Sequence, residues 1–219
     1  MIRLEHLRKV YVIKGHQKVV ADDICATFPT GVSVALLGRN GAGKSSLMRM
    51  IAGTMDPTSG RVVTDGAVSW PVGFAGSFHP DLTGAQNARF VARVYGVNSQ
   101  QLSDFVEDFA ELGPHFHLPF GTYSSGMRSR LAFGVSMGIP FDTYLVDEVT
   151  SVGDAQFRRK SDAVFFERMK TSGAVVVSHS MGMIRRLCTM GAVLEDGKLT
   201  MFDNVEDAIA AHERNMGVA

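Results

Sequence analysis

A glycine-rich segment near residue 40 has the composition and spacing of a phosphate-binding loop. Residues 38–45 read Gly-Arg-Asn-Gly-Ala-Gly-Lys-Ser, which fits the pattern G-x-x-x-x-G-K-[ST] at every fixed position. Glycines let the backbone curl so that successive N–H groups point at phosphate oxygens. In such a loop the lysine reaches the β- and γ-phosphates, and the next hydroxyl can ligate Mg²⁺. Lys44 and Ser45 have these places, so the segment predicts that the chain binds a nucleoside triphosphate.

The sequence on either side of this loop fits the same interpretation. Residues 32–37 are a nearly continuous apolar run, typical of a strand buried on both faces of a parallel sheet. Residues 45–52 have helical periodicity, so the positive end of a helix dipole would face the phosphates. A glycine-rich turn that merely joins a strand to a helix is the alternative, which this context disfavours. The residues expected to bind the nucleotide here are Gly38, Asn40, Gly41, Ala42, Gly43, Lys44, Ser45 and Ser46.

Two further apolar runs end in polar residues that suit hydrolysis. Asp147 and Glu148 follow residues 144–146, and His179 stands shortly after residues 175–177. Ligands of open parallel sheets bind at the carboxyl ends of the strands. We expect Asp147 to hold Mg²⁺ directly or through water, Glu148 to activate the attacking water, and His179 to contact the γ-phosphate and orient that water. Capping of the next element by the two acids, and a structural role for the histidine, are the alternatives.

The elements that must position these residues alternate between apolar strands and amphipathic helices. This order predicts an α/β fold with a mainly parallel sheet. Short β-like segments occupy residues 2–28, and charged helical patterns occupy residues 155–170 and 205–214. A helical block over about residues 83–138 is inserted between two core strands and is expected to form a subdomain. On its first helix we expect one shared face for the apolar residues Phe90, Val91, Val94 and Tyr95.

The length and composition are those of one folded domain spanning residues 1–219. Hydrophobic residues make up 45% and charged residues 20%, and 22 Lys and Arg balance 22 Asp and Glu. A neutral chain has no general attraction to nucleic acid or anionic lipid. No apolar run approaches the roughly 18 residues of a membrane span, and the charged first residues do not resemble a signal peptide. The protein is therefore expected to be soluble and to act at a membrane only through a partner.

Two cysteines do not make a disulfide scaffold or a four-ligand zinc site. Cys25 and Cys188 both lie among apolar residues in the sequence. We expect both to be reduced, buried thiols of a cytosolic protein.

Taken together, the motifs resemble those of the nucleotide-binding subunits of ABC transporters. Gly38 to Ser45, the segment Tyr-Ser-Ser-Gly-Met at 123–127, Asp147-Glu148, residues 151–154 and His179 occur in the family's order. The resemblance spans nearly the whole chain. It implies an ABC-type P-loop ATPase with a mainly parallel core sheet, an antiparallel β subdomain and an inserted helical subdomain. It also implies ATP and Mg²⁺ as cofactors, and a homodimer that closes head-to-tail over two ATP molecules and reopens after hydrolysis.

The same resemblance implies roles for residues outside the phosphate loop. Tyr11 resembles the aromatic that stacks on adenine, although an ordinary β-strand aromatic is the alternative. Ser124, Ser125 and Gly126 look like the signature loop that contacts the γ-phosphate held by the opposite subunit, and they also fit the start of a capped helix. Asp154 looks like the aspartate of the loop that links the two sites.

The spelling of several motifs is similar to that of the ATPases of bacterial capsular polysaccharide exporters. The signature reads Tyr-Ser-Ser-Gly-Met where Leu-Ser-Gly-Gly-Gln is usual, and residues 70–73, 82–84, 128–131 and 147–150 share the similarity. Exporters of O-antigen and teichoic acid are near relatives. O-antigen ATPases often carry a carbohydrate-binding domain after the ATPase domain, for which a chain ending at Ala219 leaves no room, so the capsule type is expected.

The expected function is therefore ATP-powered export of a capsular polysaccharide. The chain would dock on an integral membrane permease at the cytoplasmic face of the bacterial inner membrane. The alternative is a soluble ABC-type ATPase acting as a mechanical switch on nucleic acid or ribosomes, which the neutral charge disfavours.

One departure from the family pattern concerns a glutamine that usually helps to coordinate Mg²⁺. Residues 73–80 contain none, and His79 stands near its place without an assigned role. Gln86 lies too far into the next helix to substitute. A module that binds ATP and barely hydrolyses it is thus a further alternative. Trp70 and Phe74 are either core residues or part of a groove that receives a helix of the membrane partner.

Overall fold

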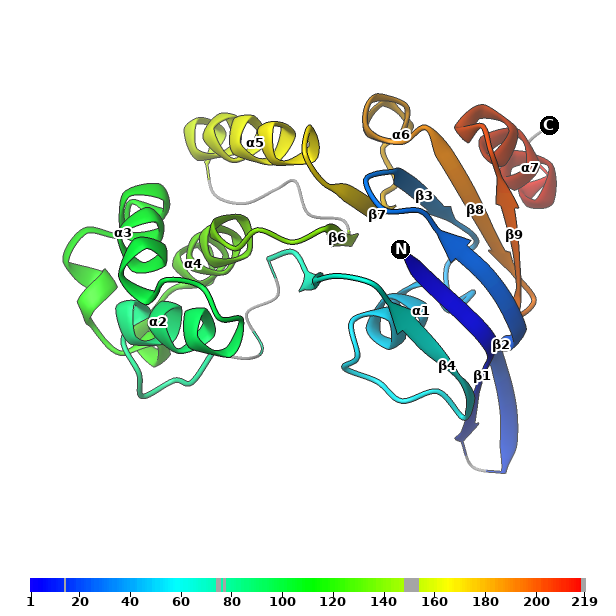
Figure 1. The fold of residues 1–219 in the computed structure, drawn as a ribbon, viewed down its shortest axis with the longest axis horizontal. Coiled ribbons are helices and arrows are strands. Elements are labelled where there is room, and N and C mark those ends of the chain that lie inside the picture. Colours follow the sequence, from blue (N-terminus) through cyan, green and yellow to red (C-terminus); the bar gives the residue numbers. More distant parts are fainter. Residues whose placement is uncertain (14, 74–75, 77, 148–153, 218–219) are drawn as a thin grey trace. The chain divides into compact units, whose positions relative to one another are not determined.

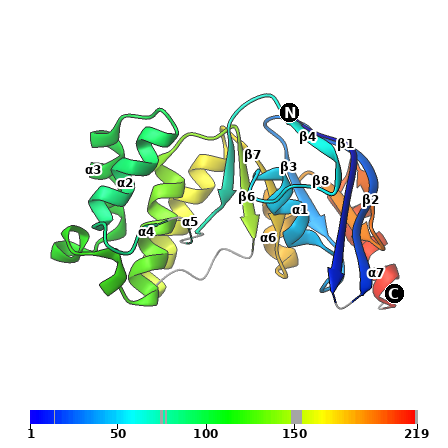
Figure 2. The same ribbon diagram turned by 90° about the horizontal axis from the view of Figure 1, so that it is seen from below.

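The computed structural model describes residues 1–13, 15–73, 76, 78–147 and 154–217, and these form two compact units. The first unit consists of Met1–Pro71, Phe141–Glu148 and Thr171–Ala219. The second consists of Val72–Pro140 and Val149–Lys170. Figures 1 and 2 show the ribbon from two directions.

A mainly parallel sheet forms the centre of the first unit. In the described residues its strand order is β5-β6-β7-β3-β8-β9, and only the β8–β9 pairing is antiparallel. All residues of β3 and β7 are buried, which explains their continuous apolar sequences. The strands are β3 (Ser33–Leu37), β5 (Val68–Pro71), β6 (Thr143–Asp147), β7 (Gly173–Val177), β8 (Met190–Glu195) and β9 (Lys198–Phe202).

A second, antiparallel sheet belongs to the same unit and has the order β2-β1-β4. Its strands are β1 (Ile2–Ile13), β2 (His16–Phe28) and β4 (Ser59–Thr64). The short segments expected over residues 2–28 are thus two long strands. The two sheets share one core, because Leu4, Leu7 and Phe28 pack in the same buried cluster as Leu36 and Leu145.

Three helices accompany these sheets in the described part of the first unit: α1 (Lys44–Ile51), α6 (Met181–Leu187) and α7 (Val205–Met216). Helix α7 packs on β8, β3 and β9. The contact is close, because a Cβ atom built on Gly191 would lie 2.2 Å from the Cβ of Ala208. None of the described helices has the length and apolar character needed to cross a bilayer.

The second unit is helical. It contains α2 (Gly84–Val94), α3 (Ser99–Ala110), α4 (Ser125–Gly138) and α5 (Ala155–Met169), with short 3₁₀ helices at Gly113–His117 and Phe120–Thr122. Helix α3 contacts both α2 and α4, and α4 also contacts α5. The block expected over residues 83–138 lies inside this unit, and α5 belongs to it as well.

The apolar face expected for the first helix is not the buried face of α2. Val91 is buried, but Phe90, Val94 and Tyr95 are 55%, 62% and 41% exposed. Helix α2 instead buries its small residues Ala85, Ala88 and Ala92 together with Val91. Small side chains allow neighbouring helices to approach closely, and the larger apolar residues are left more exposed.

Trp70, expected to be either a core residue or part of a groove, is a core residue. Its ring meets that of Phe141 edge-on, with 5.4 Å between the ring centres. Phe74 lies outside the described residues.

The two cysteines differ in burial, so the expectation of two buried thiols is wrong for Cys25. Cys25 is exposed on β2, whereas Cys188 is buried. Burial raises the pKa of the Cys188 thiol to about 12, which leaves almost no reactive thiolate at ordinary pH.

Iodoacetamide is therefore expected to label Cys25 in the folded protein and to leave Cys188 unmodified. Unfolding in denaturant should expose Cys188 and equalise the two reactivities. Peptide mass spectrometry after brief exposure at mildly alkaline pH measures both sites. Labelling of Cys188 as fast as Cys25 in the native protein would contradict the assigned burial.

Candidate nucleotide-binding site

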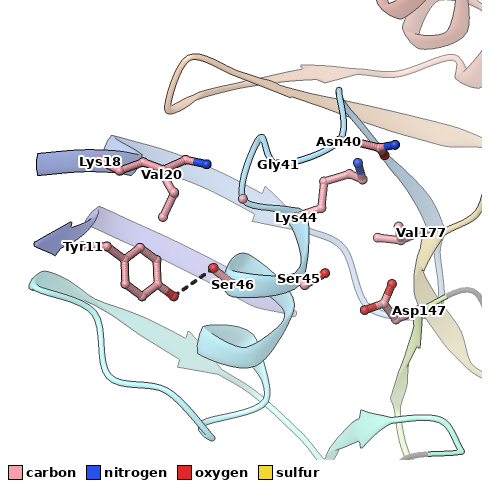
Figure 3. Close-up of a pocket in the computed structure, with 11 residues that line it drawn as sticks. Tyr11, Lys18, Val20, Asn40, Gly41, Lys44, Ser45, Ser46, Asp147 and Val177 are labelled. Atoms are coloured by element: carbon pink, nitrogen blue, oxygen red, sulfur yellow. Dashed lines mark hydrogen bonds between the residues drawn. The ribbon is translucent and has the colours of Figure 1, made fainter. Parts of the chain in front are cut away.

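A cavity of about 450 Å³ lies where the phosphate loop meets the carboxyl ends of β6 and β7 (Figure 3). All of its walls belong to the first unit. Strands β1 and β2 form one wall, and the loop with the start of α1 forms another. The lining residues are Tyr11, Lys18, Val20, Asn40, Gly41, Gly43, Lys44, Ser45, Ser46, Asp147 and Val177.

The loop can curl because its glycines have backbones that other residues rarely adopt. Gly38, Gly41 and Gly43 have φ angles of 153°, 80° and 111°. A Cβ on Gly38 would lie 2.4 Å from the Leu194 carbonyl oxygen, and one on Gly43 would lie 2.8 Å from the Val20 Cβ. Helix α1 begins directly after Gly43. The positive end of its dipole therefore meets the cavity, as an anion site requires.

We expect Gly43→Ala to weaken ATP binding by at least roughly tenfold, because the new methyl group forces the loop away from Val20. The matched control is Gly53→Ala. Gly53 also has a positive φ of 69°, but nothing lies within 4 Å of its Cβ position. Calorimetric titration with ATP measures the affinity. Thermal unfolding measures the loss of stability that alanine at a positive φ is expected to cause in both variants. Equal ATP affinities in the two variants would contradict the steric argument.

The charged and hydroxyl groups of the cavity suit a magnesium–triphosphate complex. The ammonium of Lys44 donates hydrogen bonds to the carbonyl oxygens of Gly38 at 2.6 Å and Arg39 at 3.1 Å, which hold it against the loop. Ser45 and Asp147 line the same cavity. A hydroxyl and a carboxylate offer the hard oxygen ligands that Mg²⁺ prefers. These residues therefore fit the expected metal.

Tyr11 forms part of the cavity wall through an anchored hydroxyl group. Its Oη lies 3.0 Å from Ser46 Oγ and donates to the sulfur of Met55 at 3.1 Å. Figure 3 shows the first of these contacts and the ring beside α1. Both contacts fix the ring, and a fixed ring on a cavity wall suits the stacking on adenine that the sequence suggested.

The remaining predicted residues of the first unit lie differently. Gly38 contributes the carbonyl that holds Lys44, and Ala42 lines an adjoining cavity of about 290 Å³. His179 is exposed beyond the end of β7 and is not among the residues that line the main cavity. Glu148 lies outside the described residues, as do residues 151–153.

Sequence reasoning missed the wall contributed by Lys18 and Val20. Both stand on β2, far from the loop in sequence, and enter the cavity only because β2 packs beside the loop. Nothing in their local pattern separates them from other residues of an alternating strand. Only the fold reveals them.

The pKa of His212, on α7, is affected by the charge of Lys44. Burial lowers the pKa of this histidine, and the positive charge of Lys44 lowers it further, whereas Glu195 and Glu213 act in the opposite direction. The net direction favours the neutral imidazole of His212.

The predicted signature residues begin helix α4 in the second unit. Ser124 is the N-cap, and its Oγ accepts a hydrogen bond from the Met127 N–H at 3.3 Å. The expected helix-capping role is thus confirmed. Ser125 is the first residue of the helix. A Cβ on Gly126 would meet only Ser124 Oγ, at 4.0 Å, so packing among the described residues does not require glycine there.

Asp154 connects the start of α5 to α4. Its Oδ1 accepts hydrogen bonds from the N–H groups of Gln156 at 3.0 Å and Phe157 at 2.9 Å, and its Oδ2 lies 2.9 Å from Arg130 Nη2. The bond from Phe157 is the main cause of a lowered Asp154 pKa, with Gln156 and Arg130 adding to it. The Arg130 guanidinium also lies 4.3 Å from the centre of the Phe157 ring. Arg130 thereby orients the aspartate from the signature helix.

Replacing Arg130 with methionine is expected to lower the turnover number for ATP by roughly three- to tenfold with little change in KM. The aspartate keeps its backbone bonds but loses the partner that fixes Oδ2. Steady-state phosphate release measures both constants. Arg158→Met, an exposed arginine of the same unit, is the control, and an equal loss of turnover there would remove the special role of Arg130.

The fold and the cavity together define an ATP-binding cassette: a phosphate loop and a strand-end carboxylate on a mainly parallel sheet, with an antiparallel sheet and a helical unit. The family model described as ABC transporter matches residues 21–151. The chain belongs to the ABC transporter family.

Two relatives and one solved structure illustrate the similarity. The chain is 47% identical over 212 residues to the polysialic acid transport ATP-binding protein KpsT of Escherichia coli, with 95% of each chain covered. It is 40% identical over 208 residues to the capsule polysaccharide export ATP-binding protein CtrD of Neisseria meningitidis serogroup B, covering 95% of this chain and 96% of that protein. The dimeric post-hydrolysis structure of the ATP-binding cassette MJ0796 bound to ADP and Pi has a TM-score of 0.77 at 19% identity, covering 94% of this chain and 99% of that one. This last match confirms the predicted fold class.

Proposed function

We propose that this chain is the ATP-hydrolysing subunit of a capsular polysaccharide exporter. It would act at the cytoplasmic face of the bacterial inner membrane, bound to a separate integral membrane permease. The observation that carries the proposal is the identity of 47% and 40%, over 95% of the chain, to proteins named for polysialic acid transport and capsule polysaccharide export. The cavity around Lys44 supports the ATPase part of the proposal.

The residues of the cavity divide the work of hydrolysis. The loop N–H groups and Lys44 hold the phosphates, and Tyr11 stacks on adenine. Ser45 and Asp147 would hold Mg²⁺, which when bound neutralises charge that develops on the β- and γ-phosphate oxygens. Two residues outside the described lining complete the proposal: Glu148 would accept the proton of the attacking water, and His179 would contact the γ-phosphate.

We further propose that two copies close over two nucleotides, with the second unit of one copy completing the site of the other. Gly126 supports this arrangement. Glycine near the start of a helix costs stability relative to alanine, and nothing described within the chain requires it. A γ-phosphate approaching the N-terminus of α4 from another copy gives this position a reason to lack a side chain, and the helix dipole favours such an anion.

Deletion of the gene in its host tests the transported substrate. Surface capsule should be lost and should return with the wild-type gene, but not with Lys44→Ala. Loss of O-antigen or teichoic acid with capsule intact would overturn the substrate assignment.

Purification of a tagged chain from detergent-treated membranes tests the partner. The chain should co-purify with an integral membrane protein, and co-purification with RNA instead would favour a switch that acts on nucleic acid.

A further inference from the structure

Three side chains that can ligate a metal converge on the antiparallel sheet. His6 of β1 faces Asp23 and Cys25 of β2: His6 Nδ1 lies 2.9 Å from Asp23 Oδ1 and 3.7 Å from Cys25 Sγ. The three ligand atoms all lie within 4.8 Å of one another. We propose that this trio binds a divalent cation of the zinc class.

Packing explains the irregular backbone at this place. Leu4 and Leu7 of β1 are both buried, and so are Ala21 and Ile24 of β2. In each pair the residues are three positions apart, and a regular strand would put them on opposite faces. The pairing of β1 with β2 accordingly shifts register between Leu4 and Leu7 and again before Lys9. The irregularity lets all four apolar side chains reach the core.

Packing does not explain which residues occupy the irregular positions. His6 and Asp23 have φ angles of 49° and 54°, and they are two of the four non-glycine residues with positive φ in the described chain. Glycine adopts this backbone without strain, whereas Asp and His adopt it at a cost, although a smaller one than most side chains. The exposed ion pair between these residues, 77% and 65% exposed, offsets little of that cost. Binding of a cation by both side chains would offset that cost.

The ligand set favours zinc over magnesium or calcium. A thiolate, an imidazole and a carboxylate are all established zinc ligands, whereas Mg²⁺ and Ca²⁺ take oxygen ligands. In a tetrahedron with zinc–ligand distances of about 2.0–2.3 Å the ligand atoms are about 3.3–3.6 Å apart. The separations of 2.9 and 3.7 Å need little adjustment to reach these values. The backbone N–H of His6 also donates to Cys25 Sγ at 3.4 Å, which would stabilise a bound thiolate.

The neighbourhood leaves room for a fourth ligand. His6 and Cys25 line a cavity of about 530 Å³ that is open to solvent, so water can complete the tetrahedron. Glu5 also lines this cavity, but Arg3 and Arg61 hold its carboxylate at 2.7 and 2.6 Å. None of the three proposed ligands lines the nucleotide cavity. The zinc site is therefore separate from the ATP site.

Zinc titration of the full-length, nucleotide-free protein tests the proposal. Calorimetry should show about one Zn²⁺ per chain, and Co²⁺ should give a thiolate-to-cobalt charge-transfer band. His6→Asn and Asp23→Asn are suitable variants because asparagine tolerates the left-handed backbone. Each of them, and Cys25→Ser, should lower zinc affinity by more than about tenfold, which is the loss produced even by outer-shell substitutions.

His117→Asn is the matched control, because His117 is also an exposed histidine beside a carboxylate, 3.0 Å from Glu107, but belongs to no trio of potential metal ligands among the described residues. It should bind zinc like the wild type. Zinc should also protect Cys25 of the wild-type protein from iodoacetamide, which tests the site without any substitution. Absence of zinc binding, unaltered affinity in the three ligand variants, or alkylation of Cys25 at the same rate with zinc present would overturn the proposal. ATP binding is measured separately and is expected to survive in all four variants.

Discussion

Replacing Lys44 with alanine is expected to abolish measurable ATP hydrolysis and to weaken ATP binding by roughly 10- to 150-fold. The ammonium lies in the cavity and is held there by the carbonyls of Gly38 and Arg39. In the ATP complex it would form charge-assisted hydrogen bonds to phosphate oxygens. Each such bond contributes about 1.5–3 kcal/mol, which corresponds to the stated change in affinity. Calorimetric titration measures binding, and phosphate release measures turnover.

Lys18→Ala separates the effect of this particular lysine from that of positive charge in general. Lys18 also lines the cavity, but it stands on β2 and not on the loop. We expect its removal to reduce ATP affinity by a few-fold at most, since an exposed charge is screened by solvent. Equal losses in the two variants would show that Lys44 acts only through the overall potential, and would contradict its proposed contact with the phosphates.

The phosphate loop was predictable because its chemistry depends on neighbours in the sequence. Glycine spacing, the apolar run before the loop and the helix after it are all local, and the structure places Asn40, Gly43 and Lys44 on one cavity. Asp147 was predictable for a different reason: parallel strands end at the same edge of the sheet. In the strand order only β7 separates β6, which ends at Asp147, from β3, which leads into the loop. The loop residues and Asp147 line the cavity, whereas His179, predicted by the same strand-end rule, does not, and Glu148 lies outside the described residues.

Features that depend on packing between distant segments were not predictable. Strand β8 escaped prediction because it contains Gly191, a residue type depleted in strands, which is needed there for the approach of Ala208. The apolar face of α2 was expected to consist of its largest apolar residues, whereas the face that is buried consists mainly of alanines, which allow close helix packing. Cys25 was expected to be buried, yet it faces solvent beside the irregular pairing of β1 and β2. Periodicity cannot reveal a register shift, because the shift is a property of two strands together.

Replacing Glu148 with glutamine is expected to lower ATP turnover by roughly 10²–10⁴-fold, the range over which general base catalysis contributes, while ATP binding is retained. The amide has nearly the shape of the carboxylate but cannot accept a proton from water. Since reopening of the proposed dimer follows hydrolysis, the variant should accumulate as an ATP-bound dimer. Phosphate release and size-exclusion chromatography with Mg²⁺ and ATP measure the two effects.

Asp147→Asn gives the contrast that assigns the two neighbouring acids. Asp147 lines the cavity together with Ser45, and a neutral amide is a poorer ligand for Mg²⁺ than a carboxylate. In this variant the Mg²⁺-dependent part of ATP affinity should fall, and dimers should not accumulate, whereas in Glu148→Gln the affinity persists and only the chemical step fails. Unchanged hydrolysis in Glu148→Gln would remove Glu148 from the role of base. Trapped dimers in Asp147→Asn alone would reverse the two assignments, because the residue whose loss stops the reaction after closure is the one that acts on the water.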